Sequence, residues 1–347
     1  MTQTRVLTGD TPTGRLHLGH WVGSLENRVQ MQSDYDCFFL LANTHAYTTK
    51  NDALAGVYQH VNEIVLDYLS VGIDPAKSTI FVESDVPAIF ELAMLLSMWI
   101  PWPRLLRNPT IKDEIRDKNL GENYSAGFLM YPVLQAADIL AFQAELVPVG
   151  EDQIPHIELT REVARRMNQL CDEQGLCKGD VSPLFVLPKA QLGRAHRLVG
   201  IKGPGANGQL QKMSKSLNNA IFLSDSADEV QQKVMQMYTD PNRLRASDPG
   251  TVENNPLWIF HDLFNPNTDW VAEAKSRYQQ GAIGDVACKK ELVAVLNAKL
   301  EPIRARRKAF EQDPGYVHSV LRAGKERANA VAGETLARVK AAFKQQF

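Results

Sequence analysis

Two short stretches of the chain carry basic side chains at the same spacing. His17 and His20 are three residues apart, and so are Lys212 and Lys215. Residues three apart lie on one side of a helical turn. Lysine is a point charge on a flexible stem, which suits it to following phosphate oxygens as charge develops on them. The two stretches predict a site that acts on phosphate groups by positioning and charge, without an obvious nucleophile.

The first of these stretches follows a glycine-rich turn. Val6 and Leu7 are typical of the end of a buried strand, residues 9–14 turn the chain, and a helix is expected from His17. Free backbone N–H groups and the positive end of the helix dipole make such a turn suitable for an anion. Many α/β proteins have a turn of this kind, so the turn alone is weak evidence for a phosphate site. The lysine stretch makes that interpretation stronger.

One carboxylate stands in apolar surroundings. Asp138 lies within the helical run Gln135–Leu140, where an unpaired charge would be costly. A salt bridge on the helix or a capping role is the structural alternative. The functional interpretation is an acceptor for a ligand group that only donates, such as the indole N–H.

These stretches also resemble a known family. His17-Leu-Gly-His20 and Lys212-Met-Ser-Lys-Ser216 resemble the two signatures of class I aminoacyl-tRNA synthetases, and the resemblance runs from about Arg5 to beyond Arg307. The blocks that begin at Tyr131 and Val147 resemble the tryptophanyl branch. The resemblance implies that ATP and L-tryptophan form an adenylate and pyrophosphate, with Mg²⁺ sharing the phosphate charge, before transfer to tRNA(Trp).

The resemblance also implies roles for individual side chains, with no side chain as a metal ligand. The catalytic residues are His17, His20, Lys212 and Lys215. The tryptophan-binding residues are Tyr131, Asp138 and Gln153, the first and last for the amino group. The ATP-binding residues are Thr11, Pro12, Thr13, Gly19, His20, Gly150, Glu151, Asp152, Leu198, Lys212, Met213, Ser214, Lys215 and Ser216.

Strands and helices alternate along the first part of the chain. Apolar runs at 35–41, 78–82 and 145–149 predict strands, which helices at 57–68 and 87–98 help to connect. This order favours an α/β fold with a parallel sheet, and ligands then lie at the carboxyl ends of the strands. Residues 9–14 and 43–45 should share that edge.

The second part of the chain is expected to be helical. Helices are predicted at 227–238, 256–264, 270–279 and 288–311, with Pro302 kinking or splitting the last, and a terminal helix at 325–347 after Gly324. We expect a Rossmann-like catalytic domain at 1–224 that binds ATP and tryptophan. An all-helical C-terminal domain at 225–347 would bind the tRNA anticodon, and its terminal helix could pack back on the first domain.

Composition bounds the remaining possibilities. The net charge is −2, so the protein as a whole is not positively charged, and any contact with RNA would need a local patch of basic side chains. The charged stretch 104–118 predicts a solvated helix face, with an RNA-acceptor or dimer surface as the alternative. No signal peptide or membrane-length apolar run is evident, and we expect a cytoplasmic protein without membrane contact. The resemblance implies a homodimer.

Four cysteines, Cys37, Cys171, Cys177 and Cys288, are scattered along the chain. Without an export signal they are expected to be buried or idle thiols, not disulfides. Some members of the family hold an iron–sulfur cluster on a tighter cysteine pattern, which this chain lacks.

Three features depart from the family pattern. Asn43 stands where Asp is more frequent, Gln135 replaces a commonly apolar residue beside Asp138, and the loop before Lys212 is longer. Three other functions share part of this pattern: the tyrosine enzyme, a paralogue that binds tryptophan or RNA as a regulator, and a small-molecule nucleotidylyltransferase. The block from Tyr131 to Gln153 favours tryptophan over tyrosine, both intact signatures disfavour the regulator, and the helical region disfavours the nucleotidylyltransferase.

Overall fold

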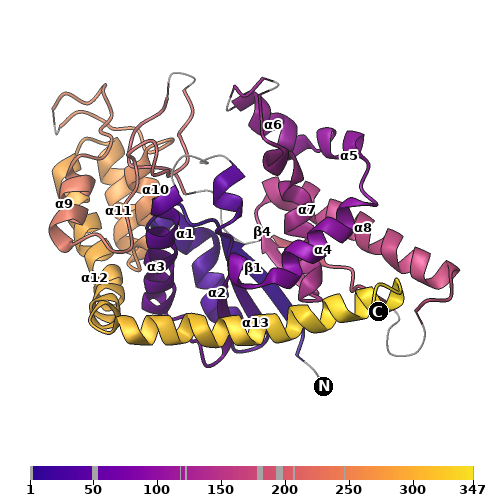
Figure 1. Cartoon of the computed structure of the whole chain (residues 1–347). Coiled ribbons are helices and arrows are strands. Elements are labelled where there is room, and N and C mark those ends of the chain that lie inside the picture. The colour runs from indigo at the N-terminus through magenta and orange to yellow at the C-terminus, as the bar shows by residue number, and fades with distance from the viewer. Residues whose placement is uncertain are drawn as a thin grey trace.

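A computed structural model describes residues 3–48, 54–117, 119–121, 123–177, 183–192, 198–205, 208–245 and 247–346. Its centre is a sheet of five parallel strands in the order β3-β2-β1-β4-β5 (Figure 1). The predicted parallel sheet is therefore confirmed. The strands are β1 (Arg5–Asp10), β2 (Asp36–Leu41), β3 (Ser78–Val82), β4 (Leu146–Val149) and β5 (Lys189–Leu192).

The inner strands are apolar because helices cover both faces of the sheet. Every residue of β2 after Asp36 is buried, and this strand lies in register with β1, Val6 opposite Cys37. Strand β5 was not predicted. Its sequence, Lys-Ala-Gln-Leu, is mostly exposed at the sheet edge, so it lacks the apolar run by which the other strands were recognised.

The helices of the first part join and cover these strands. After α1 the chain makes a π-helical turn at Trp21–Leu25 and continues into α2, and 3-10 turns follow β2, β3 and β4 at His45–Thr48, Glu83–Asp85 and Glu151–Gln153. The helices are α1 (Leu18–His20), α2 (Glu26–Met31), α3 (Leu54–Val71), α4 (Pro87–Ser97), α5 (Trp102–Leu106), α6 (Pro109–Asp117), α7 (Ala126–Ala141) and α8 (Ile154–Glu173).

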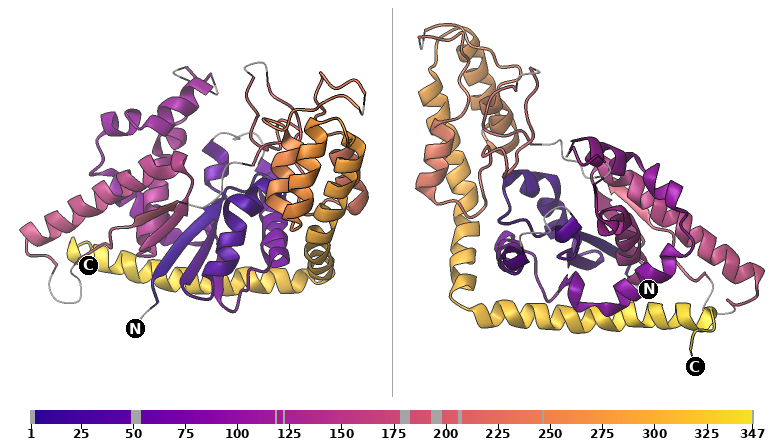
Figure 2. Two further views of the ribbon diagram at one scale, coloured as in Figure 1. Left: turned by 180° about the vertical axis from the view of Figure 1, so that it is seen from behind. Right: turned by 45° about the horizontal axis from the view of Figure 1, so that its top comes forward.

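Only helices follow residue 224 in the described part of the chain. The longest two, α12 and α13, meet at a corner and frame two sides of the molecule (Figure 2). The predicted helices at 227–238, 256–264, 270–279 and 288–311 are all present, within a few residues. They are α9 (Ala227–Met235), α10 (Pro256–Phe264), α11 (Thr268–Gln279), α12 (Asp285–Glu311) and α13 (Pro314–Ala342).

Three helix predictions need correction. Residues 104–117 of the charged stretch 104–118 belong to two helices, because Asn108 and Pro109 interrupt it, and residue 118 lies outside the described residues. Pro302 does not split α12, and the alternative of a kink at this proline stays a prediction. The terminal helix begins at Pro314 and runs through Gly324, where a Cβ atom would collide with the carbonyl oxygen of Ile80 in β3. That glycine permits close helix–strand packing instead of starting the helix.

The terminal helix packs back on the sheet, as expected. Arg327 of α13 pairs with Asp36 of β2 at 2.6 Å, and Lys340 pairs with Glu91 of α4 at 2.7 Å. One apolar core also contains residues from both sides of position 224, among them Val65 and Leu300. The helical region is thus packed tightly against the sheet region, and the boundary after residue 224 stays a prediction.

One cysteine prediction was wrong. Cys171 and Cys177 form a disulfide, with Cα atoms 5.3 Å apart. After α8 the chain turns back through Gly175, and the N–H of Leu176 donates to the carbonyl oxygen of Cys171 at 2.8 Å, which brings the two residues together. Cys37 and Cys288 are buried thiols, as expected.

Among the described residues, every helix is too short or too polar to cross a membrane.

Candidate active site

A cavity of about 470 Å³ opens at the carboxyl ends of the strands. Thr11 follows β1, Gly150 and Gln153 follow β4, and Tyr131 and Asp138 come from α7; all five line the cavity. The whole predicted tryptophan set therefore meets in one space. The parallel sheet causes this, because its strand ends share one edge.

Asp138 lies deep in this cavity, and its carboxylate is only partly satisfied. The residue is 2% exposed, and its Oδ1 atom is buried without a hydrogen-bond partner. Burial and the nearby negative charge of Glu83 raise the pKa of Asp138, and His45 opposes them. An unpaired buried acceptor is costly, so a donor that enters the cavity gains the hydrogen bond that this oxygen lacks.

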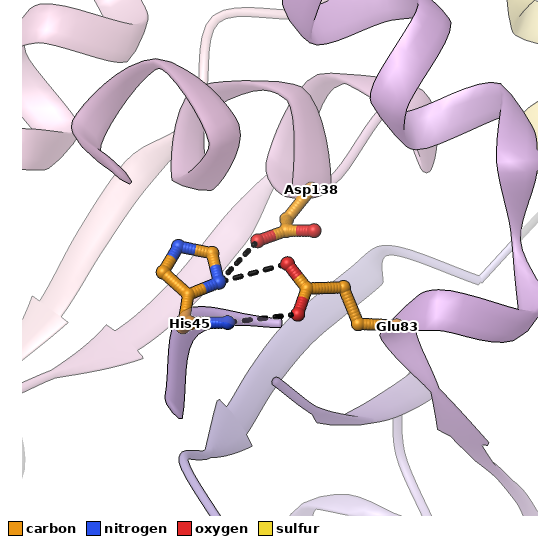
Figure 3. A group of neighbouring side chains, drawn as sticks. All are labelled: His45, Glu83 and Asp138. Atoms are coloured by element: carbon orange, nitrogen blue, oxygen red, sulfur yellow. Dashed lines mark hydrogen bonds and ion pairs between the residues drawn. The ribbon is translucent and has the colours of Figure 1, made fainter. Parts of the chain in front are cut away.

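Asp138 belongs to a group with Glu83, which is also buried, and the partly buried His45 (Figure 3). The Nδ1 atom of His45 lies 2.8 Å from Glu83 and 4.0 Å from Asp138. Burial alone would lower the pKa of His45, but the hydrogen bond and charge of Glu83, together with Asp138, raise it to about 9. His45 is therefore a cation at neutral pH that offsets part of the charge of two carboxylates.

The lining of the cavity also contains polar side chains that bond one another. The hydroxyl of Tyr131 donates to Glu114 at 3.0 Å and lies 3.2 Å from Nε2 of His156. Nε2 of Gln135 donates to Oε1 of Gln153 at 3.2 Å. Gln135, one of the departures from the family pattern, therefore holds a side chain from the predicted amino-group site.

The second end of the site, which does not line this cavity, is built by His17 and His20, and these two residues cap each other. The N–H of Gly19 donates to Nδ1 of His17, and the N–H of His17 donates to Nδ1 of His20, both at 3.1 Å. Each ring is therefore left with Nε2 as its N–H donor when neutral. Burial first, then nearby cations, lowers the pKa of His17 to about 3, and burial lowers that of His20 to about 4.

The second signature lies against the first. Nζ of Lys215 donates to Oγ1 of Thr13 at 3.1 Å and to the carbonyl oxygen of Gly14 at 2.9 Å. The N–H of Met213 donates to the carbonyl oxygen of Leu198 at 2.9 Å, which ties the lysine loop to a buried segment. Two stretches far apart in sequence thus form one surface of neutral N–H donors and ammonium groups, suited to phosphate oxygens.

A buried ion pair fixes the turn between the two ends. Arg28 of α2 donates to Asp10 at 2.7 Å, and the hydroxyl of Tyr68 donates to the same carboxylate at 2.6 Å. Arg28 also bonds the carbonyl oxygen of Gly9. Asp10 and Arg28 line the cavity, so this pair holds the glycine-rich turn at its wall.

The family model for class I tRNA synthetases (W and Y) matches residues 1–301. The tryptophan–tRNA ligase of Treponema pallidum is 50% identical over 341 residues, covering 98% of this chain and 96% of that protein. The chain belongs to the tryptophan–tRNA ligase family. The corresponding enzyme of Clostridium longisporum is 47% identical over 98% of this chain and 96% of its own length.

Solved structures of tryptophan–tRNA ligases share the fold. The tryptophanyl-tRNA synthetase of Campylobacter jejuni, solved with ADP and tryptophan, has a TM-score of 0.82 and 31% identity, covering 97% of this chain and 98% of that one. The Rossmann-like class and the helical C-terminal region are thereby confirmed, and the recognition from both signatures was correct.

The remaining residues predicted from the tryptophan–tRNA ligase signatures lie around the two ends. Pro12 and Leu198 are buried, whereas Glu151 and Ser216 are exposed. Oγ of Ser214 and that of Ser216 are 3.0 Å apart, and Gly19 lies beside Met213. Asp152 lies in the turn Glu151–Gln153, directly before α8. The ligand contacts of these residues remain predictions.

Sequence reasoning assigned no role to Glu83, His45, Asp10 or Arg28. Glu83 follows β3 directly, so the strand-edge argument that placed residues 43–45 also applies to it. Asn43, the first departure, pairs with Ser84 beside it: its Nδ2 donates at 2.9 Å to the serine hydroxyl. Residues 206–207 of the long loop lie outside the described residues.

Proposed function

We propose that this tryptophan–tRNA ligase binds the indole of L-tryptophan at Asp138 and the ATP triphosphate between His17, His20 and the lysine loop. The observation that carries the proposal is that Asp138 lines the cavity and has a buried Oδ1 atom without a hydrogen-bond partner. The indole N–H is a donor without an acceptor, so it satisfies this oxygen and leaves nothing unpaired. A phenylalanine side chain would leave it unpaired.

The two ends then divide the reaction. Tyr131 and Gln153 hold the amino group, so that the tryptophan carboxylate faces the α-phosphorus of ATP. Lys212 and Lys215 neutralise the charge that builds on the leaving pyrophosphate, and Nε2 of each histidine donates to the phosphates. Thr11, Pro12, Thr13, Gly19, Gly150–Asp152, Leu198 and 213–216 surround the nucleotide in this scheme.

Mg²⁺ is proposed to enter on the phosphate oxygens of ATP. Among the described residues, one group of three side chains has the spacing of a metal site, namely His45, Glu83 and Asp138. His45 and Glu83 already bond each other, and the group lies at the predicted indole end. It suits Mg²⁺ poorly, because that ion prefers six oxygen ligands. We therefore propose no protein ligand for it.

The assembly is proposed to be a cytoplasmic homodimer that binds tRNA(Trp) through its helical region. Met94 of α4, Met98 just after that helix and Trp102 of α5 are 60%, 67% and 54% exposed, and they form an apolar face that a second copy would cover. Met98→Asp should shift the sedimentation coefficient from that of a dimer toward that of a monomer. An unchanged coefficient would place the interface elsewhere.

ATP–pyrophosphate exchange across the twenty amino acids, followed by charging of total tRNA, tests the function. Exchange should depend on tryptophan, be weak with tyrosine or phenylalanine, and lead to charging of tRNA(Trp) alone. Equal exchange with tyrosine would contradict the assignment of Asp138 and its pocket. Exchange without charging would favour the regulatory paralogue.

A further inference from the structure

The backbone just before His17 is held from several sides. The N–H of Leu16 donates to Oδ2 of Asp67 at 2.7 Å, while its carbonyl oxygen accepts from the N–H of Leu223 at 3.0 Å. The N–H of Leu18 donates to the carbonyl oxygen of Ile221 at 2.9 Å. Because the His17 backbone lies between these two residues, their partners decide where its imidazole sits.

Asp67 comes from α3 and does not line the cavity. It is fully buried, and burial raises its pKa to about 6 even though Arg307 opposes the shift. Its two oxygens have different partners: Oδ2 accepts from Leu16, and Oδ1 accepts from Arg307 at 2.6 Å. One carboxylate therefore joins the backbone of the first signature to a side chain 240 positions later in the sequence.

Arg307 lies on α12, in the helical region. Besides Asp67, its guanidinium bonds Glu63 of α3 at 2.6 Å and Glu311 of its own helix at 2.8 Å. Three carboxylates bind the rigid, planar guanidinium and hold it in one orientation. A lysine ammonium could not make this set of contacts. The position of Asp67 thus depends on where α12 lies against α3.

Helix α12 also contacts the segment Ile221–Asp225, whose first and third residues bond the backbone on either side of His17. NH1 of Arg304 donates to the carbonyl oxygen of Asp225 at 3.3 Å, and the Asp225 carboxylate accepts from the N–H of Phe222 at 2.8 Å. Phe222 lies between Ile221 and Leu223, the partners of Leu18 and Leu16. Helix α12 is therefore connected to the backbone around His17 by two routes, one through Asp67 and the other through Asp225.

We propose that Asp67 and Arg307 are positioning residues for adenylate formation, through which α12 fixes the backbone at Leu16 and the imidazole of His17. This inference rests on the proposed role of His17 at the phosphates. Neither side chain reaches the cavity, so they act only through the backbone they hold.

An asparagine at position 67 cannot replace this link. Two donors, the Leu16 N–H and the Arg307 guanidinium, meet the two carboxylate oxygens, and an amide offers only one acceptor oxygen. In the exchange assay, Asp67→Asn and Arg307→Met should each lower kcat/KM for ATP by about tenfold, because a small misplacement of a catalytic group is costly. The KM for tryptophan should stay within about twofold, since the tryptophan pocket lies elsewhere.

The matched control is Arg306→Met. Arg306 neighbours Arg307 on α12 and bonds α3 through the carbonyl oxygen of Ser70 at 2.6 Å, but it does not contact Asp67. It should exchange like the wild type. If the Arg306 and Arg307 variants lose equal amounts of ATP kcat/KM, or if the KM for tryptophan rises in parallel, the inference is wrong.

A double variant separates positioning from stability. Asp67→Leu with Arg307→Met removes both buried charges, so it should fold even where a single variant does not, because no buried charge is left unpaired. The ATP defect should persist in this stable protein. Recovery of wild-type kcat/KM would make the pair purely structural. A wild-type enzyme without tryptophan-dependent exchange would contradict the proposed function instead.

Discussion

The two ends of the site use histidine in opposite charge states. At the phosphate end, burial lowers the pKa of His17 to about 3 and that of His20 to about 4, with Lys215 adding to both shifts. At the indole end, the hydrogen bond and charge of Glu83 overcome burial and raise the pKa of His45 to about 9. Burial prevails at His17 and His20, where Lys215 adds to it and only Asp10 opposes the shift of His20, whereas the Glu83 and Asp138 carboxylates outweigh burial at His45.

The difference matches what each end is proposed to bind. Phosphate brings several negative charges, so an end with lysines and neutral N–H donors needs no further carboxylate. Indole brings one N–H and no charge, so the other end needs a fixed acceptor, and His45 provides the cation that makes two buried carboxylates tolerable. A change of charge at one end should therefore leave ligand binding at the other end unaffected.

The largest effect is expected at the phosphate end. Lys215→Ala, and separately Lys212→Ala, should lower kcat for exchange on the order of 10²-fold, because an electrostatic contact to developing charge is lost. Tryptophan binding without ATP, measured by calorimetry, should hardly change. Lys202→Ala is the control, since that lysine bonds the carbonyl oxygen of Leu217 in the same region. Normal kcat in both lysine variants would make this loop a solvated surface.

A smaller effect is expected from Glu83→Gln at the indole end. The glutamine oxygen can still accept from the N–H of Thr44, but the charge that supports the His45 cation is lost. The KM for tryptophan should rise by about tenfold, as for the loss of one charge-assisted hydrogen bond, while the KM for ATP stays unchanged. Ser84→Ala, next in sequence, should leave both constants as they are. Equal rises in both KM values would mean that the two ends are not independent.

The smallest effect concerns stability against pH. The folded-state pKa of His45, about 9, lies above its ordinary value of 6.5, so its stabilisation is complete below pH 6.5 and is lost as pH rises through 9. Between pH 6.5 and 9.5 the melting temperature of the wild type should fall by about 2–4 °C more than that of Glu83→Gln. Parallel curves for the two proteins would show that Glu83 does not hold His45 charged.

The sequence predicted those parts of the fold and of the site that leave a pattern in neighbouring residues. The turn before His17, the apolar run of β2 and the acid of α7 are visible because strands, helices and a misplaced charge leave short-range signals. Glu83 leaves a weak signal, because it and His45, 38 positions away, directly follow the neighbouring strands β3 and β2. Asp67 leaves none, since an acid in a mixed sequence looks the same whether it is solvated or buried. Its partner Arg307 is 240 positions away, and only the packing of α12 against α3 reveals the pair.

Gly324 and β5 show two further limits. A glycine in a helical pattern usually suggests an end, but here it lets α13 approach β3. An edge strand of mixed polarity has no apolar period to detect. Both features depend on a neighbour distant in sequence, and local propensity contains no information about that neighbour.

Asp138 is proposed to select tryptophan by accepting a hydrogen bond from the indole N–H. Asp138→Ala should lower kcat/KM for tryptophan and, in the same step, reduce discrimination against phenylalanine, with ATP affinity near that of the wild type. A melting curve checks that the variant is folded. Tyrosine is a poorer probe, because its hydroxyl can also donate to this carboxylate.

The most direct measurement compares tryptophan with β-(3-benzothienyl)alanine, in which sulfur replaces the indole N–H at nearly the same shape. In the exchange assay the wild type should prefer tryptophan in kcat/KM by about 10–100-fold, since the analogue leaves a buried carboxylate oxygen unpaired. In Asp138→Ala that ratio should fall close to one. A ratio that stays unchanged in the folded variant would contradict the account and make Asp138 a structural residue.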